Sequence, residues 1–104
     1  MIFNKLHKTL NSLHKKNYII EFYSDNAFSI ALSFYHKNSP YNGLCYISKE
    51  AERFSIDFQY HKHNKTVKKQ LENVCKMVYT LYKLNQLDLV KKMFDNYKIK
   101  TLAG

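Results

Sequence analysis

The chain has 104 residues, of which 45% are hydrophobic and 15% aromatic, and its formal net charge is +9. This length is enough for one domain with a hydrophobic core, and this composition excludes an intrinsically disordered chain. No apolar run is long enough to cross a bilayer, and the N-terminus lacks the continuous apolar segment of a secretory signal. We therefore expect one domain over residues 1–104, located in the cytoplasm, with reduced thiols at Cys45 and Cys75.

Charge is distributed unevenly along the chain. Residues 1–16 contain four lysines and no acid, residues 17–60 contain three bases and five acids, and residues 61–104 contain ten lysines and three acids. A nearly neutral middle between two basic ends predicts a surface that attracts a negatively charged partner. Because all but one of the basic residues are lysines, we expect diffuse attraction and not the bidentate contacts typical of arginine.

Residues 2–16 are predicted to form an amphipathic helix, with one apolar side and one side that carries four lysines. Four strands are expected after it, at 18–24, 27–35, 44–48 and 53–61, because polar and apolar residues alternate there and turn-forming residues separate the runs. Short connections between successive strands favour an antiparallel meander.

Two helices are predicted for the C-terminal part of the chain. Apolar residues recur at helical spacing over 65–84, with Asn64 as the N-cap. The sequence Asn85-Gln86-Leu87-Asp88 resembles a capping motif, so we expect a break there and a further helix up to residue 97, with one kinked helix as the alternative. Residues 97–104 are expected to form a frayed tail. The predicted fold is α+β in the order α-β-β-β-β-α-α, with helices covering one face of an antiparallel four-stranded sheet.

The other face of the sheet is predicted to be flat, nearly neutral and flanked by tyrosines, with Cys45 also on this side. Small side chains let another surface approach closely, and tyrosines provide contact area at low entropic cost. We therefore expect either a solvated sheet face or an interface with a partner protein or a second copy of the chain. The candidate interface residues are Tyr23, Ser29, Ala31, Ser33, Tyr35 and Ile47.

The densest cluster of cations lies between the last strand and the long helix. A helix N-terminus presents free N–H groups and the positive end of the helix dipole, which attract anions. Lysines there would either strengthen a phosphate site or simply be solvated. Together with the lysines of the N-terminal helix, the candidate nucleic-acid or anion-binding residues are Lys5, Lys8, Lys15, Lys16, His61, Lys62, His63, Lys65, Lys68 and Lys69.

The sequence carries no catalytic motif. Its acids are scattered, and with glycine only at Gly43 and Gly104 it has no glycine-rich loop for phosphate. A zinc site built from the cysteines with His61 and His63 would lack the usual paired cysteine spacing. We expect a non-enzymatic protein with no metal and no cofactor.

The order α-β-β-β-α, with Lys65, Lys68 and Lys69 opening the helix after the sheet, resembles the double-stranded-RNA-binding domain family. That resemblance implies lysines that span phosphates at the start of this helix. The chain differs from the family in its fourth strand, its third helix and its lack of a glycine-bearing loop between strands. Its size, composition and element order also resemble small proteins of bacteriophages and mobile elements, including inhibitors of host nucleases.

Three functions are compatible with these features. The first is nucleic-acid binding through the lysine-rich helices, largely without sequence specificity. The second is a phage- or mobile-element-type inhibitor or adaptor. It would bind a nucleic-acid-processing protein, such as a nuclease or a CRISPR effector, through the basic helices and the tyrosine-rimmed sheet face. Membrane-surface association through the helix at 2–16 ranks last, because the apolar side of that helix is needed to cover the sheet.

Overall fold

A computed structural model describes residues 2–25, 29–38, 42–48, 52–59 and 65–103 of the chain. The chain begins with one helix, continues through four strands and ends with two helices, so the predicted order is confirmed. The elements are α1 (Ile2–Lys15), β1 (Tyr18–Asp25), β2 (Ser29–His36), β3 (Asn42–Ser48), β4 (Arg53–Gln59), α2 (Lys65–Lys83) and α3 (Leu87–Ala103).

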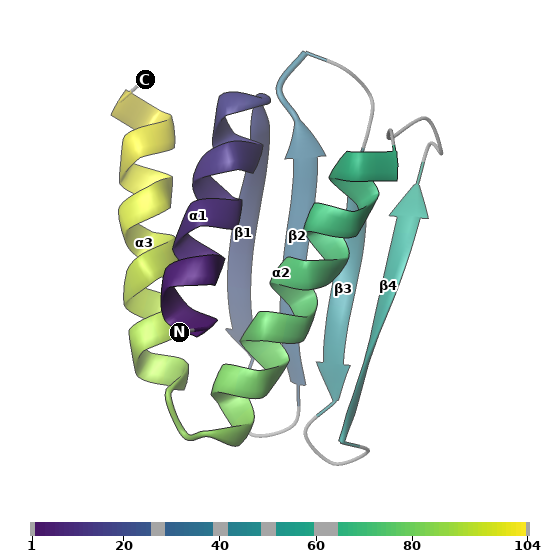
Figure 1. The fold of residues 1–104 in the computed structure, drawn as a ribbon, viewed down its shortest axis with the longest axis vertical. Coiled ribbons are helices and arrows are strands. Elements are labelled where there is room, and N and C mark those ends of the chain that lie inside the picture. The colour runs from purple at the N-terminus through teal and green to yellow at the C-terminus, as the bar shows by residue number, and fades with distance from the viewer. Residues whose placement is uncertain (1, 26–28, 39–41, 49–51, 60–64, 104) are drawn as a thin grey trace.

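The four strands form one antiparallel sheet in the order β1-β2-β3-β4, as predicted. All three helices lie on the same face of this sheet (Figure 1). Helices α1 and α3 pack on β1, and α2 contacts β3, β4 and both other helices. The opposite face of the sheet carries no helix, so the described elements form two layers.

The hydrophobic core lies between the helix layer and the sheet. Ile30, Leu32 and Phe34 alternate along β2, and each is at most 1% exposed. The helices contribute stripes with three- and four-residue spacing. These stripes are Leu6, Leu10 and Leu13 in α1, and Val67, Leu71, Val74, Cys75, Val78 and Leu81 in α2. The apolar side of α1 is therefore used in the core, and no helix of the described chain is long and apolar enough to cross a membrane.

The two faces of β3 are the reverse of those predicted. Cys45 and Ile47 were expected on the outer face, but both are fully buried. Cys45 lies opposite Leu32 of β2 and Ile56 of β4, and directly opposed residues of antiparallel strands point to the same side of a sheet. The outward position between the two buried residues belongs to Tyr46, which is exposed.

Gly43 fits the observed orientation of β3, in which positions 43, 45 and 47 point toward the core. It lies opposite Phe34 of β2 and Phe58 of β4 on the inward side. A Cβ atom at Gly43 would overlap the Phe34 ring and would lie 2.7 Å from the carbonyl oxygen of Asp57. The Phe34 ring occupies the space that a side chain at position 43 would need, so only glycine fits there.

The junction between α2 and α3 is closed by an asparagine with a left-handed backbone. Asn85 has a φ of 59°. The Gln86 N–H donates to the Leu81 carbonyl oxygen at 2.9 Å, and the Asn85 N–H donates to the Tyr82 carbonyl oxygen at 3.0 Å. This is the Schellman pattern, which satisfies carbonyl groups at a helix end. The predicted break between two helices is confirmed, but Asn85 ends α2 and does not cap α3.

Helix α3 is longer than predicted. It starts at Leu87 and extends to Ala103, so it includes most of the segment 97–104 that was expected to fray. The residues after 97 are lysine, isoleucine, threonine, leucine and alanine, none of which breaks a helix, and glycine comes only at position 104. The predicted cap Asn64 lies outside the described residues.

We expect Gly43→Ala to lower the free energy of unfolding by about 1–3 kcal/mol, because the added methyl group overpacks the contact with Phe34. Each kcal/mol lowers Tm by about 4–8 °C in a chain of this size. Urea unfolding followed by circular dichroism measures the change. Ser33→Ala, on the outward side of β2, is the control and should change stability by less than about 0.5 kcal/mol. Equal effects of the two substitutions would contradict the packing role of Gly43.

Candidate nucleic-acid interface

Helices α1 and α2 lie side by side and antiparallel on the sheet (Figure 1). Polar contacts join them at one end. Lys16 Nζ donates to Gln70 Oε1 at 2.8 Å, and Gln70 Nε2 donates to Ser12 Oγ at 2.9 Å. Gln70 therefore uses both ends of its amide to hold the C-terminal end of α1 against α2. This contact holds the end of the Lys16 side chain beside α2.

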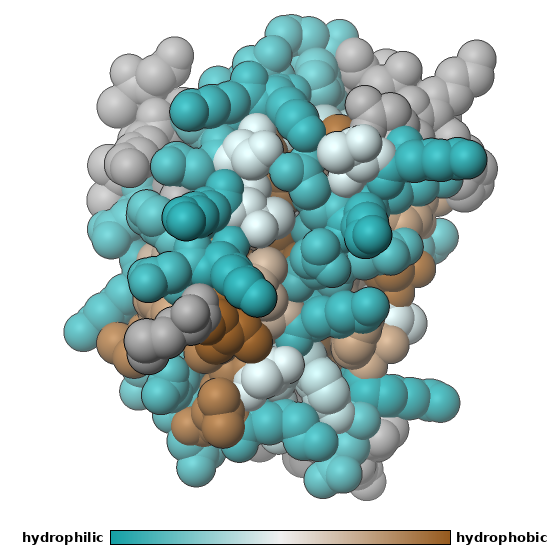
Figure 2. Space-filling model, in the orientation of Figure 1, coloured by the Kyte–Doolittle hydropathy of each residue, from teal (hydrophilic) through white to brown (hydrophobic). Residues whose placement is uncertain are grey.

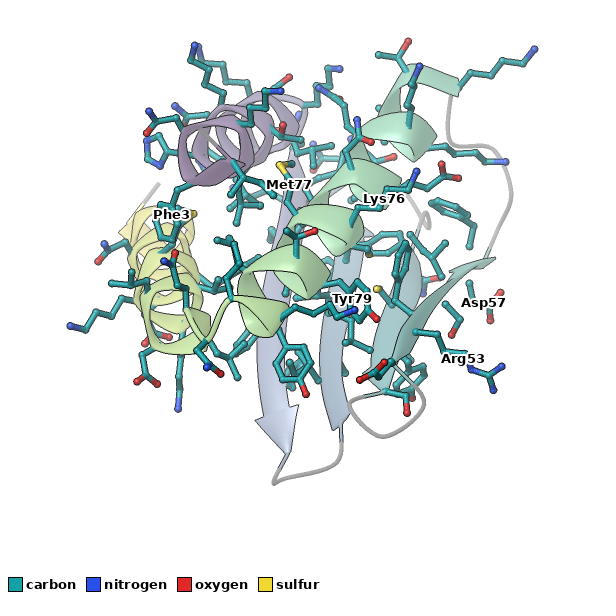
Figure 3. The ribbon with its side chains drawn as sticks, turned by 60° about the horizontal axis from the view of Figure 1, so that its bottom comes forward. Phe3, Arg53, Asp57, Lys76, Met77 and Tyr79 are labelled. Atoms are coloured by element: carbon teal, nitrogen blue, oxygen red, sulfur yellow. The ribbon has the colours of Figure 1, made fainter. Side chains whose placement is uncertain are left out.

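A groove of about 520 Å³ lies between the same two helices, nearer to the start of α1. Figure 3 shows Met77 between α1 and α2, with Lys76 on the outer side of α2. The groove combines apolar contact area with three lysines, and no acid lines it. This α1–α2 groove is lined by Ile2, Lys5, Lys8, Thr9, Asn73, Lys76 and Met77.

Exposed lysines form a row along each of the two helices. In α2 they recur at spacings of four and seven residues, which keeps them on one side of the helix, and in α1 they lie outward or toward α2. Figure 2 shows that the helix layer presents a mostly hydrophilic surface, with hydrophobic surface gathered near the start of α1 and the α2–α3 junction. We call this set the basic helix face: Lys5, Lys8, Lys15, Lys16, Lys65, Lys69, Lys76 and Lys83, all exposed.

Negative charge is scarce around the basic helix face. Helix α1 contains no acid, and α2 contains only Glu72. Glu72 is half-buried and shares a helix stripe with Lys68 and Tyr79, whose side chains contact Phe58 and Phe54 of β4. Glu72 also lies three residues from Lys69 and four from Lys76, so it is a neighbour of both lysines on the helix surface. Within α1 and α2, this half-buried carboxylate is the single negative side chain beside the eight lysines of the basic helix face.

Lys68 is less exposed than its sequence neighbours Lys65 and Lys69 and has an aromatic contact, as does Lys83, whose Nζ lies 5.2 Å from the centre of the Tyr79 ring. Lys68 was predicted to bind anions together with Lys65 and Lys69, but its side chain is half-buried and its Nζ lies 5.5 Å from the centre of the Phe58 ring. The ring quadrupole attracts a cation in this position, so Lys68 contributes to the packing of α2 on β4. Lys65 and Lys69 are exposed on the outer side of α2.

The other candidate anion-binding residues divide into two groups. The lysines predicted in the N-terminal helix all lie on the basic helix face, whereas His61, Lys62 and His63 lie outside the described residues. Lys76 and Lys83 of the basic helix face were not among the predicted residues. Lys76 comes seven residues after Lys69, and Lys83 comes seven residues after Lys76, which was a visible signal because two helical turns return a side chain to the same side.

The sheet face opposite the helices is rich in tyrosine and small residues, and we call it the open sheet face. Tyr23, Tyr35 and Tyr46 are 49%, 37% and 52% exposed. Ala31 lies opposite both Tyr23 and Tyr46, so a small residue separates two tyrosines in one row across three strands. The small side chain of Ala31 therefore lies between the larger rings of Tyr23 and Tyr46 on this face.

Most of the predicted interface residues lie on the open sheet face. Ala31 and Ser33 are half-buried there, beside the tyrosines of β1 and β2. Ile47 does not lie there, because it points into the core, and the side chain of Ser29 lies outside the described part of the chain. Tyr46 was missed, although polar Asn42 and Ser48 share its alternation and indicated that this side of β3 faces outward.

A carboxylate holds two of the tyrosines on the open sheet face. The Tyr23 hydroxyl donates to Glu21 Oε2, and the Tyr35 hydroxyl donates to Glu21 Oε1 at 3.3 Å. The hydrogen bond to Glu21 is the main cause of a raised pKa at Tyr23, and desolvation is the main cause of a raised pKa at Tyr35. Both hydroxyls therefore remain protonated donors at neutral pH, which orients the two rings.

Cys45 of β3 and Cys75 of α2 form a buried pair of thiols. The hydrogen bond with Cys45 and burial in the core both raise the pKa of Cys75. A protonated thiol in the core is a poor nucleophile and a poor metal ligand. Among the described residues, no group of three or more histidines, cysteines and acids could hold a metal ion.

We expect the native thiols to react with Ellman's reagent at least about a hundredfold more slowly than the thiols of the denatured chain, because reaction requires opening of the core. The raised pKa of Cys75 also predicts that its contribution to stability is complete below the ordinary thiol pKa, about 8.5, and declines as the pH rises above it. Reaction kinetics with and without guanidinium test the burial. One rapidly reacting equivalent of thiol in the native protein would contradict it.

Comparison with protein-family models found no match, and neither curated proteins nor solved structures gave a match. No family match therefore supports the resemblance to double-stranded-RNA-binding domains.

Proposed function

We propose that the protein is a non-enzymatic nucleic-acid-binding protein that places the phosphate backbone along the basic helix face. One observation carries this proposal: seven exposed lysines lie on two adjoining helices and an eighth, Lys16, directly follows α1, whereas Glu72 is the single acid in the two helices. Such a surface lowers the electrostatic free energy of a polyanion that lies along it and releases the counterions of that polyanion.

The dimensions of α2 suit a polyanion better than a single small anion. At a rise of about 1.5 Å per residue, the row from Lys65 to Lys83 is about 27 Å long. A B-form strand presents one phosphate for about every 3.4 Å of helix axis, and so about eight phosphates over that distance. The row on α1 runs beside it, so several lysines can contact phosphates at once.

Lysine also determines the expected specificity. An ammonium group is a compact charge without the planar fork that arginine offers to guanine or to two phosphate oxygens. The basic helix face contains no arginine. We therefore expect similar affinity for different base sequences and a steep loss of affinity with salt.

Fluorescence anisotropy of a labelled duplex, titrated at several salt concentrations, tests the proposal. The logarithm of the binding constant should fall with the logarithm of salt concentration, by about 0.9 for each phosphate neutralised on B-form DNA. The variant Lys8→Glu/Lys76→Glu alters both sides of the α1–α2 groove. It should weaken binding at least about tenfold and reduce the salt slope by about two.

The matched control is Lys91→Glu/Lys92→Glu. It changes the net charge by the same amount, but both lysines are exposed on α3 and do not line the groove. Its affinity should remain much closer to that of the unmodified protein. Equal losses in the two variants would assign binding to net charge alone, and absence of binding at low salt would overturn the proposal.

A second candidate function is an inhibitor or adaptor that docks on a nucleic-acid-processing protein. The open sheet face favours it, because its three exposed tyrosines surround small residues and offer contact area of the kind found in protein interfaces. A nucleic acid bound along the helices would leave this face unused, since it lies on the other side of the sheet.

For this candidate, Tyr23→Ala/Tyr46→Ala should remove a partner protein retained from a nuclease-treated bacterial lysate and leave duplex affinity unchanged. Leu84→Ala/Leu89→Ala is the control, because it also shortens two exposed large side chains but lies away from the sheet. If the tyrosine variant retains the same partner, the open sheet face is not the docking surface.

A further inference from the structure

The two edge strands of the sheet are not equivalent. Helix α3 packs against β1, and Phe94 of α3 stacks on Phe22 of β1 with ring centroids 5.5 Å apart. At the other edge, β4 is seven residues long, and within the described chain no strand pairs with its outer side. A free edge of this length presents backbone N–H and C=O groups that can pair with another strand.

The inward side chains of β4 are incompletely covered. Phe54, Ile56 and Phe58 are half-buried, whereas the inward residues of the central strand β2 are fully buried. The helix layer therefore ends over β4 and leaves apolar area at the edge (Figure 1). This area would be removed from water if a further strand with its own helix layer lay alongside β4.

The outward side chains of β4 indicate which strand fits. Arg53, Ser55 and Asp57 are exposed on this side, with the positive charge at the first residue of the strand and the negative charge four residues later. Figure 3 shows Arg53 and Asp57 on β4 at the edge of the molecule, away from the helices. An antiparallel strand of the same sequence presents these charges in reverse order, so the edge is complementary to itself.

We propose that β4 pairs antiparallel with β4 of a second copy of the chain, which joins the two four-stranded sheets into one. Opposed residues must point to the same side of the sheet, which limits the register. With Ser55 opposite itself, Arg53 of each copy lies opposite Asp57 of the other, and Phe54 lies opposite Ile56. The helix layers of the two copies then lie on the same side of the joined sheet.

Charge distinguishes this register from its neighbours. With Ile56 opposite itself, Arg53 would lie opposite Gln59 and Asp57 opposite Ser55, so neither charge would meet its opposite. The register centred on Ser55 forms two cross-strand ion pairs and also brings Glu52 of one copy toward the end of β4 where Lys68 lies over Phe58. Opposite charges across strands stabilise pairing, and like charges oppose it.

Sedimentation velocity at increasing protein concentration, without nucleic acid and at about 0.15 M salt, tests the dimer. The unmodified chain should shift from monomer to dimer. Arg53→Asp and Asp57→Arg should each weaken dimerisation about tenfold or more, because each places like charges opposite one another at two positions. An equimolar mixture of the two variants should form a heterodimer as stable as the unmodified dimer, because both of its cross-strand pairs have opposite charges.

Circular dichroism of both single variants checks that they remain folded, and the recovered heterodimer shows the same independently. A chain that stays monomeric at every concentration would overturn the proposal. So would single variants that dimerise as well as the unmodified chain, or a mixture that associates no better than either variant alone. A dimer lost in Tyr23→Ala/Tyr46→Ala and kept in the charge variants would assign dimerisation to the open sheet face instead.

Discussion

Burial of the inward side of β2 beneath the helix layer is the constraint on which the rest of the structure depends. Ile30, Leu32 and Phe34 are at most 1% exposed. A shift of one residue in the pairing of β2 would turn all three toward solvent and lose the hydrophobic free energy of their burial. This cost fixes the register of β1 and β3, and the Phe34 ring then requires a glycine at position 43.

The same burial separates the two polar surfaces of the molecule. Because α1 and α2 direct their apolar stripes to the sheet, their lysines must point to the opposite side. The strand residues that alternate with the buried ones point to the open sheet face. These residues are mostly small or tyrosine, and together they are nearly neutral. One side of the fold therefore attracts negative charge, and the other offers aromatic contact area without a strong field.

The asymmetry between the sheet edges follows from the helix connection. The left-handed Asn85 ends α2 and lets the chain reverse, so α3 returns along the sheet and packs on β1. Helix α3 is the last element of the described chain, so no further helix covers β4 as α3 covers β1. The free edge of the sheet is therefore β4. Lys68 and Tyr79 of α2 contact Phe58 and Phe54 of this strand but leave both rings half-buried.

Periodicity in the sequence was sufficient to predict the elements, their order and the buried sides of α1, β2 and α2, because these depend on neighbours only a few residues away. It also predicted the lysine row of α1. It failed where a residue's surroundings come from distant parts of the chain. Both sides of β3 contain apolar residues, so the polar residues Asn42 and Ser48 were the only local signal that Tyr46 faces outward, and the contact of Phe34 with Gly43 became visible only in the structure. Likewise, the different surroundings of Lys68 and of Lys65 and Lys69 depend on the packing of α2 on β4. A helix distributes its lysines around its axis, and the position of the sheet determines that Lys68 is the one that contacts Phe58.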